Sequence, residues 1–366
     1  MKIVGTIVEY NPLHNGHVYA INQIKKESQA DVVIAVMSSS ITMRGELSLF
    51  NKFEKTHQAL KAGLDLIIEL PFCYTVHNSD LFSYHSIYLL NLAKVDEIWI
   101  GSESNNPSIY EKAYNEFNKK ENQEKIKKLL DIGMSYKQAT NEIYALPSND
   151  LLGYSYYKAL KQINPNIPLK TIKRVGSTYF DESPKEFASA YAIRNNLSLA
   201  KDYCPNFIHI ENVLDQEKLF SYLKYQIQTK TTKELTNIFL VEEGIENKLH
   251  KVETFDTYND FISSLVSKRY TKSRIQRMLT YILFNITKKD MDDILNNLPL
   301  HIRVLGYTNK GQEYIKTIKK DVKIYTNIKN NIHPSIDIEL KVSTILDSIY
   351  NTNIKKLEQS KPIMED

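Results

Sequence analysis

Apolar and polar residues alternate in blocks along the first hundred positions. Short, continuous apolar runs predict buried strands over Ile3–Val8, Val32–Met37, Leu66–Leu70 and Glu97–Ile100. Between them, apolar residues at helical spacing predict helices over His17–Glu27, Lys52–Ala62 and Asp80–Leu92. The alternation is typical of an α/β fold, a doubly wound parallel sheet with Rossmann-like topology. Such sheets bind ligands beyond the carboxyl ends of their strands. Four loops are therefore expected to share one crevice: Glu9–His17, Ser38–Glu46, Pro71–Asn78 and Gly101–Ser104.

The later pattern predicts two domains. Residues 1–200 form the first, an α/β domain with a Lys-, Glu- and Asn-rich helical insertion near 106–147. Its further elements are a helix over Asp150–Gln162, a strand over Pro168–Val175 and a helix over Phe187–Leu199. Residues 201–366 form a mainly α-helical second domain, whose clearest amphipathic stretch is Ser264–Ile286. Two short runs near its end, Ile302–Tyr307 and Asp321–Thr326, read as strands.

Composition narrows the class of protein. The 366 residues are 42% hydrophobic and 25% charged, enough for two folded cores. Cys73 and Cys204 have no second cysteine nearby, so neither a disulfide framework nor a cysteine-based metal site is indicated. No apolar run approaches a membrane span and no leader precedes the first strand, which favours a cytoplasmic enzyme. The net charge of +4 is unevenly spread: residues 268–329 hold 14 Lys or Arg against 5 Asp or Glu.

The most informative segment is Tyr10-Asn11-Pro12-Leu13-His14-Asn15-Gly16-His17, directly after the first strand. A helix that starts at a His-x-Gly-His step offers backbone N–H groups to a phosphate, with two imidazoles beside it. His14 and His17 are the candidate catalytic residues, because they can stabilise the charge that develops when an α-phosphorus is attacked. Gly16 would let a phosphate approach the backbone. Residues 1–200 are therefore expected to be a nucleotide-binding catalytic domain. Asn11 could position the ligand or a metal-bound water, whereas Glu9 could serve the site or only the turn.

These residues resemble the nucleotidyltransferases and ligases that carry a His-x-Gly-His step near the N-terminus. Members of that class have a second motif, similar to Ile-Ser-Ser-Thr-x-x-Arg, whose hydroxyls and arginine hold phosphates. Here Ser189-Ala190-Tyr191-Ala192-Ile193-Arg194 occupies the corresponding place. Ser189 and Arg194 match, whereas Tyr191 stands where a small hydroxyl residue is expected.

A closer resemblance is to the bacterial tRNA(Met) cytidine acetate ligases. It rests on spaced matches in one order, namely the segment from Val8 to His17, Met43–Glu46, Ile68–Pro71, Gly101–Glu103, Thr171–Arg174 and Arg303–Gly306. The resemblance implies that acetate and ATP form an acetyl-adenylate, and that the acetyl group passes to N4 of the wobble cytidine of elongator tRNA(Met). ATP with Mg²⁺ and acetate would be used, without acetyl-CoA, and no obligate protein partner is indicated.

The resemblance also implies the nucleotide contacts. They fall on Ile7, Val8, Glu9, Tyr10, Asn11, Pro12, Leu13, His14, Asn15, Gly16, His17, Val18, Tyr19 and Ala20, together with Gly101, Asn149 and Arg174. Ser189 and Arg194 join them through the second motif. For the amide contact, Asp150 remains an alternative to Asn149. Gly101 could instead be an ordinary turn glycine, and Arg174 a partner in a structural salt bridge. No carboxylate cluster marks a metal site, so phosphates and water would hold the magnesium.

Basic residues of the second domain could contact tRNA. Lys268, Arg269, Lys272, Arg274 and Arg277 fall on or beside one predicted helix. Arg44 lies in the loop after the second strand, where it could reach pyrophosphate or tRNA. A solvated helix face is the competing explanation for the basic residues, and Tyr270 and Tyr281 could stack or simply pack. Lys52 and Lys55 are expected at solvated helix positions.

Two other functions remain open on the sequence alone. A small-molecule nucleotidyltransferase would carry the same catalytic domain, but would not need the long, locally basic C-terminal region. A module that binds a nucleotide without turnover would not need the two histidines.

Overall fold

The computed structural model describes residues 1–174, 187–242, 244–268, 270–328 and 332–366. One mixed sheet crosses this part of the chain in the strand order β5-β4-β1-β2-β3-β6-β7, with β8 beside β6. The strands are β1 Ile3–Val8, β2 Val32–Ser38, β3 Leu66–Leu70, β4 Glu97–Ser102, β5 Leu169–Lys173, β6 His301–Thr308, β7 Lys323–Tyr325 and β8 Ile363–Glu365. Strands β1 to β5 are parallel to one another, whereas β6 runs antiparallel to β3. The predicted α/β fold with a doubly wound parallel sheet is confirmed.

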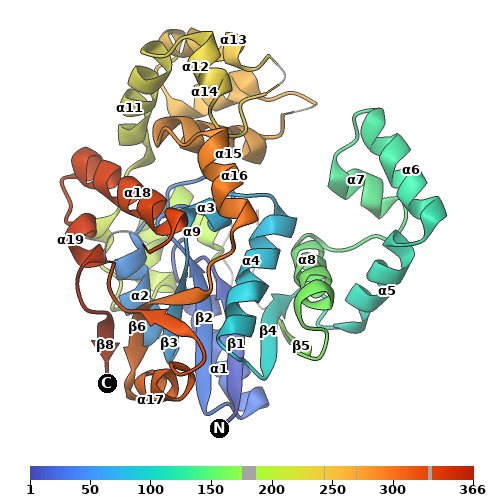
Figure 1. The fold of residues 1–366 in the computed structure, drawn as a ribbon, viewed down its shortest axis with the longest axis vertical. Coiled ribbons are helices and arrows are strands. Elements are labelled where there is room, and N and C mark those ends of the chain that lie inside the picture. The colour runs from blue at the N-terminus through green and yellow to red at the C-terminus, as the bar shows by residue number, and fades with distance from the viewer. Residues whose placement is uncertain (175–186, 243, 269, 329–331) are drawn as a thin grey trace.

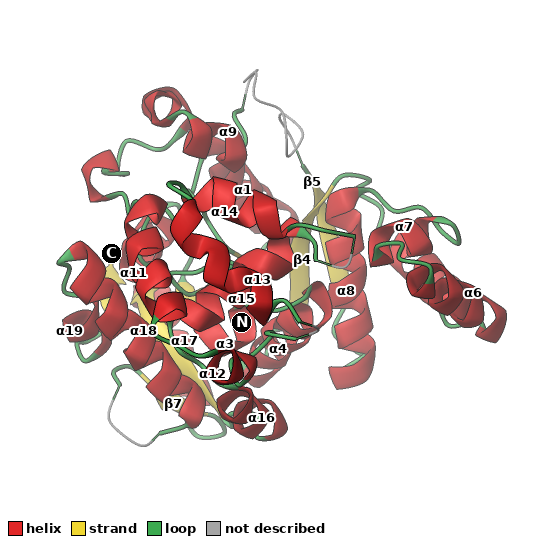
Figure 2. Ribbon diagram, turned by 90° about the horizontal axis from the view of Figure 1, so that it is seen from above, coloured by secondary structure: helices red, strands yellow, loops and turns green. Residues whose placement is uncertain are grey.

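The apolar runs become strands because both faces of the sheet are covered. All seven residues of β2 and all five of β3 are buried, and helices flank the strands on both sides (Figure 2). A continuous apolar run is the pattern that a strand covered on both faces requires. The helices of this part are α1 Asn15–Ser28, α2 Lys52–Lys61, α3 Phe72–Thr75, α4 Ser79–Leu92 and α8 Ser148–Ile163. Side chains cap three of them at their N-termini: His14 on α1, Asn51 on α2 and Asn78 on α4.

Three helices lie between β4 and α8, within the segment where the sequence predicts an insertion. They are α5 Ser108–Phe117, α6 Lys120–Asp131 and α7 Tyr136–Asn141. Helices α6 and α7 project away from the sheet (Figure 1). Helix α6 buries only Ile126, which explains why its sequence is mostly charged.

A second group of helices gathers beyond one end of the sheet (Figure 1). After β5 the chain forms α9 Ala190–Asn195, η1 Leu197–Leu199, α10 Ala200–Tyr203, η2 Ile210–Asn212, α11 Gln216–Gln228, α12 Thr232–Thr236, α13 Glu246–Leu249, η3 His250–Thr254, α14 Tyr258–Leu265, α15 Lys272–Leu283 and α16 Lys288–Asn296. The single helix predicted over Phe187–Leu199 is shorter, because α9 ends at Asn195 and a 3₁₀ turn follows.

The chain then returns to the sheet. The sequence instead predicts a separate, mainly α-helical domain over residues 201–366. Both predicted C-terminal strands exist, as β6 and β7, and helices α17 Asn309–Ile318, α18 Pro334–Tyr350 and α19 Ile354–Glu358 accompany them. Strand β6 pairs with β3 and closes that edge of the parallel strands. A Cβ at Gly306 would lie 2.6 Å from the methyl carbon of Thr56 and 2.9 Å from the carbonyl oxygen of Ile363, so only glycine fits there. The sequence predicts strand β6, but tertiary contacts decide that it pairs with β3.

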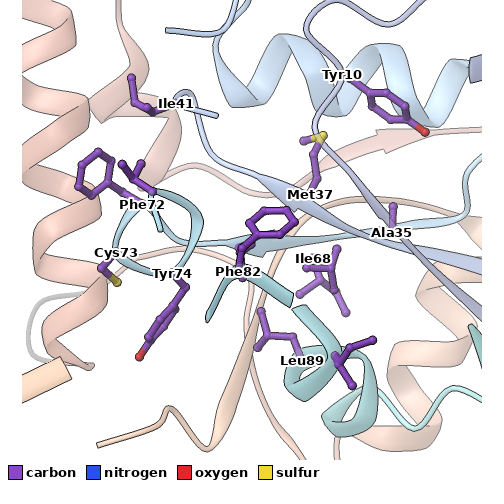
Figure 3. Close-up of a cluster of buried hydrophobic side chains, with 14 of the residues drawn as sticks. Tyr10, Ala35, Met37, Ile41, Ile68, Phe72, Cys73, Tyr74, Phe82 and Leu89 are labelled. Carbon is purple, nitrogen blue, oxygen red and sulfur yellow. The ribbon is translucent and has the colours of Figure 1, made fainter. Parts of the chain in front are cut away.

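The hydrophobic core is shared by the sheet and the helical group. Figure 3 shows part of it, where Phe82 of α4 lies toward Met37 and Ile68 of the sheet, and Phe72 and Tyr74 of α3 lie farther away. The Phe72 ring also lies 5.3 Å from that of Tyr281 on α15, edge to face. Both cysteines are buried free thiols. In the described part of the chain, no helix is both long and apolar enough to cross a membrane.

Candidate active site

The turn from β1 into α1 places two histidine rings side by side. Nδ1 of His14 accepts a hydrogen bond from the backbone N–H of Gly16 at 3.1 Å, and Nδ1 of His17 accepts one from the backbone N–H of His14 at 3.3 Å. The ring centroids are 3.8 Å apart. A Cβ on Gly16 would lie 3.0 Å from Cε1 of His14, so a side chain there would push that ring aside. Gly16 therefore leaves room for the His14 ring. This role adds to the one expected from the sequence, which is to let a phosphate approach the backbone.

Both imidazoles are neutral. Burial, and secondly the positive charge of Arg174, lower the pKa of His14 to about 3. Burial, then His14 and Arg174, lower the pKa of His17 well below its ordinary value. Because each Nδ1 accepts a backbone hydrogen bond, we assign the proton of each neutral ring to Nε2. The corner therefore holds two Nε2–H donors at the positive end of a helix.

The two histidines line a pocket of about 300 Å³ at the carboxyl ends of the strands. From the predicted run between Ile7 and Ala20, the lining residues are Ile7, Val8, Glu9, Tyr10, Asn11, His14, Gly16, His17, Tyr19 and Ala20. Pro12, Leu13, Asn15 and Val18 do not line it, since Leu13 is fully buried and Val18 packs against the core. The loop Pro71–Asn78 also stays out of the pocket, contrary to expectation, because its apolar residues form the buried helix α3.

Gly101, Asn149 and Arg174 meet on another wall of the pocket. A Cβ on Gly101 would lie 3.3 Å from Cγ of Arg174, so the arginine lies across the glycine. Asn149 donates from Nδ2 to the Glu103 carboxylate at 2.5 Å. Asp150 is buried and accepts hydrogen bonds from the Tyr110 hydroxyl, at 2.8 Å, and from the backbone N–H of Ser104. Of the two candidates that the sequence left open, Asn149 therefore faces the pocket and Asp150 supports the loop behind it.

The second motif contributes a further part of the pocket wall. Ser189 and Arg194 both line it, and the Ser189 hydroxyl accepts the backbone N–H of Ala192 as the cap of α9. Arg194 donates to the backbone carbonyl of Asn11 at 2.6 Å and lies 3.8 Å from the Glu46 carboxylate. The side-chain oxygen of Asn11 accepts the backbone N–H of Leu49 at 2.8 Å. This hydrogen bond holds the end of the loop after β2 against the β1–α1 turn. Arg194 thus joins the β1–α1 turn to the loop after β2.

Sequence reasoning missed Lys55 and Lys52, which were expected in solvent. Both side chains are fully buried. Nζ of Lys55 donates to the backbone carbonyls of Glu9, at 2.8 Å, and of Ser39, at 2.7 Å, and it lies 3.2 Å from the Ser38 hydroxyl. Lys55 therefore ties together the two loops that follow β1 and β2. No local signal marks either lysine, because most residues of α2 are polar.

The whole chain is similar in sequence to known proteins. A family model described as HIGH Nucleotidyl Transferase matches residues 1–361. A tRNA(Met) cytidine acetate ligase of Geobacillus sp. (strain WCH70) is 35% identical over 399 residues, covering 99% of this chain and 99% of the relative. The enzyme of that name from Bacillus subtilis (strain 168) is 33% identical over 382 residues, covering 94% of this chain and 92% of the relative. The chain belongs to the tRNA(Met) cytidine acetate ligase family.

Solved structures of this ligase family share the fold. Apo Thermotoga maritima TmcAL superposes with a TM-score of 0.89 at 27% sequence identity, covering 100% of this chain and 99% of the other. The same Thermotoga protein bound with alpha-thio ATP gives a TM-score of 0.87 at 26% identity, with the same coverage. The predicted family and fold are both confirmed.

In this member of the ligase family, α15 packs against the loop that contains Gly45. A Cβ on Gly45, whose φ is +79°, would lie 2.6 Å from the backbone nitrogen of Arg277. The Thr280 hydroxyl donates to the Gly45 carbonyl at 2.8 Å, and Gln276 donates to Glu46 at 3.2 Å. Arg44 and Glu46, on either side of Gly45, line the pocket. The helix predicted to bind tRNA thus packs directly against a loop of the pocket.

The predicted basic residues differ in exposure. Lys268 and Lys272 are exposed. The Arg274 guanidinium lies 4.5 Å from the ring centre of Tyr270 and 3.5 Å from Glu242. Burial, with Arg274 nearby, lowers the pKa of Arg277 to about 10. Arg269 lies outside the described residues.

Tyr270 and Tyr281 pack rather than stack on a ligand. Both are buried, and their hydroxyls donate to the backbone carbonyls of Glu242 and Val76, respectively. Neither ring is therefore available to a nucleobase on the surface.

Proposed function

We propose that this protein is an ATP-dependent ligase that activates acetate as acetyl-adenylate and acetylates N4 of the wobble cytidine of elongator tRNA(Met). The observation that carries the proposal is the pair of neutral imidazoles at the start of α1, inside the pocket of a chain from this family. Two Nε2–H donors beside a helix N-terminus suit a phosphate on which negative charge develops.

The residues of the pocket suggest how adenylation proceeds. ATP lies with its phosphates against the β1–α1 corner and its nucleoside toward Gly101 and Asn149. A carboxylate oxygen of acetate attacks the α-phosphorus, and the bond to the pyrophosphate breaks. His14 and His17 donate from Nε2 to the oxygens that gain charge, while Arg174 offers its guanidinium to the phosphates. Ser189 and Arg194 hold the wall opposite them.

No protein nucleophile is needed for the second step. AMP is a good leaving group, so the acetyl group passes from the adenylate directly to the cytosine amine, without acetyl-CoA. Cys73 and Cys204 are buried and neither lines the pocket, in agreement with this route. Magnesium would accompany the ATP. Among the described residues no group of three or more His, Cys, Asp or Glu can hold a metal ion, so we propose that phosphates and water bind it.

The tRNA would approach along α15. Lys268 and Lys272 are free to contact its phosphates, and Arg44 lies where that surface meets the pocket. An anticodon base is not in a duplex, so it can enter the pocket unstacked at a modest energetic cost. The cytoplasm is where such a substrate would be found.

Transfer of labelled acetate tests the proposal. The protein is incubated with ATP, Mg²⁺, labelled acetate and elongator tRNA(Met), beside a transcript whose wobble cytidine is replaced by uridine. We expect label on the first tRNA only, and none when acetyl-CoA replaces ATP and acetate. Equal labelling of both transcripts would refute the assigned base. Labelling of neither, by protein that binds ATP, would refute the ligase.

A further inference from the structure

The second step of the proposed reaction needs a group that accepts a proton. The exocyclic amine of cytosine loses one proton when it becomes an amide, and a positioned base raises the rate of such a step. His14 and His17 do not meet this need, because each Nδ1 already accepts a backbone hydrogen bond and each Nε2 carries the proton. The two imidazoles can donate hydrogen bonds during adenylation, but they are not placed to accept the proton that the amine loses during acetyl transfer.

Two carboxylates line the described part of the pocket, Glu9 and Glu46. Glu46 is engaged at both oxygens: Oε1 accepts from Gln276 at 3.2 Å, and Oε2 lies 3.8 Å from Arg194. Glu9 differs from it. Its Oε1 accepts the backbone N–H of Met43 at 2.7 Å, whereas its Oε2 accepts no hydrogen bond from any described residue. Because Glu9 is partly exposed and lines the pocket, this second oxygen is open to a ligand.

The Glu9 carboxylate is held rigidly. Lys55 donates to its backbone carbonyl at 2.8 Å, and the Met43 N–H fixes its side chain. It stands at the end of β1, immediately before the segment that carries the two histidines. A carboxylate is a poor choice for contacting a triphosphate, since like charges repel. It is a good choice for contacting cytosine, because Asp and Glu accept hydrogen bonds from the N4 amine.

We propose that Glu9 receives the N4 amine of the cytosine and takes its proton during acetyl transfer. This inference rests on the proposed function. The lone pair of N4 attacks the acetyl carbonyl carbon, the bond from that carbon to the phosphate oxygen breaks, and its electron pair leaves with AMP. One N4 proton passes to Oε2 of Glu9. Adenylation uses the histidines and transfer uses the glutamate, so one pocket serves both steps with different residues.

The surroundings of Glu9 suit a base. Burial is the largest influence and raises the pKa of its carboxyl above the ordinary value, so the carboxylate is a stronger base. The charged and titratable groups around it are Lys55 on α2, Arg44 and Glu46 in the loop after β2, and Tyr156 on α8. Lys55 and Arg44 act against the rise, whereas Glu46 adds to it.

Glu9→Gln tests this assignment sharply. The amide oxygen can still accept the Met43 N–H, but the side chain can no longer take a proton. Two steps are measured separately: acetate-dependent exchange of labelled pyrophosphate into ATP without tRNA, and single-turnover transfer from preformed adenylate to elongator tRNA(Met). We expect transfer slower by about 10²-fold or more, and slowed by a much larger factor than exchange. Glu46→Gln is the matched control for the second carboxylate of the pocket.

The pH profile provides a second test that does not depend on a variant. The transfer rate of the parent should rise with pH through the ionisation of Glu9, and this rise should persist in Glu46→Gln and disappear in Glu9→Gln. Parental transfer by Glu9→Gln would overturn the assignment. So would an equal loss of both steps, a raised KM for ATP alone, or a raised Mg²⁺ requirement for exchange, which would place Glu9 at the nucleotide or the metal. If the parent itself labels no tRNA, the proposed function fails first.

Discussion

Two lysines one turn apart on α2 show how the same residue type serves two regions of this molecule. Lys52 and Lys55 are both fully buried. Lys52 lies in an ion-pair cluster with the carboxylates of Glu69, Glu339 and Glu358, and Arg303 of β6 pairs with the first and third of these. Lys55 forms no ion pair with a described residue, and donates instead to the loops beside the pocket.

The difference separates what stabilises the fold from what shapes the pocket. The cluster around Lys52 joins α2 and β3 to β6, α18 and α19, so it fixes the C-terminal part of the chain to the sheet. None of its residues lines the pocket. Lys55 fixes loops whose residues do line it, including Glu9. Removing the two charges should therefore affect different properties.

The largest effect on stability is expected from Lys52→Met. It leaves three buried carboxylates with a single cation, and breaking such a buried pair costs on the order of 3–5 kcal/mol. Urea unfolding should show this loss, whereas the KM for ATP of the folded protein should stay near the parental value. Lys94→Met, which removes an exposed pair with Asp321, is the control and should leave the unfolding midpoint unchanged. A similar midpoint for Lys52→Met and Lys94→Met would contradict the role of the cluster.

Lys55→Met should affect the pocket more than the fold. The carbonyls of Glu9 and Ser39 lose their buried donor, which costs about 1–3 kcal/mol. The loops after β1 and β2 should shift, and a small displacement can slow a positioned reaction by up to about 10²-fold. Acetate-dependent pyrophosphate exchange, measured where the variant is fully folded, checks this. The comparison between the two lysines fails if exchange falls in Lys52→Met and not in Lys55→Met.

A smaller effect on stability is expected from pH, because the cluster holds three carboxylates but only two cations, Lys52 and Arg303. Burial, and then Glu69 and Glu358 against the attraction of Lys52, raise the pKa of Glu339 from 4.5 to about 7. A carboxyl with a raised pKa stabilises the folded state below its unfolded pKa and loses this contribution as pH rises through the folded value. The stability of the parent relative to Glu339→Gln should therefore decline between about pH 4.5 and pH 7. Urea unfolding of both proteins across this range measures the difference, and a constant difference would contradict the prediction.

Local patterns predicted the structure of the β1–α1 corner. The strand, the His-x-Gly-His step and the first helix are contiguous in sequence, so their geometry depends on neighbouring residues. The choice between Asn149 and Asp150 could not be made in the same way. It depends on Tyr110, Ser102 and Ser104, which contact Asp150 over sequence separations of 40, 48 and 46 residues.

The buried charges and the C-terminal strands were harder to predict. The sequence alone places Lys52 in solvent, but its partners Glu339 and Glu358 lie 287 and 306 residues farther along the chain. Strand β6 pairs with β3 although the facing residues Ile67 and Gly306 are 239 residues apart. Long-range pairs of this kind leave no periodic signal, so propensity and spacing alone assigned α2 a solvated face and the C-terminal region a domain of its own.

The most direct test of the account is acetate-dependent exchange of labelled pyrophosphate into ATP, without tRNA, by the parent and by His17→Ala. The account predicts exchange by the parent only when acetate is present. It predicts a loss of on the order of 10²-fold or more in the variant, because one preorganised donor at the α-phosphate is removed. Equal exchange by both proteins would contradict the role of the histidine pair, and acetate-independent exchange by the parent would contradict acetate as the activated acid.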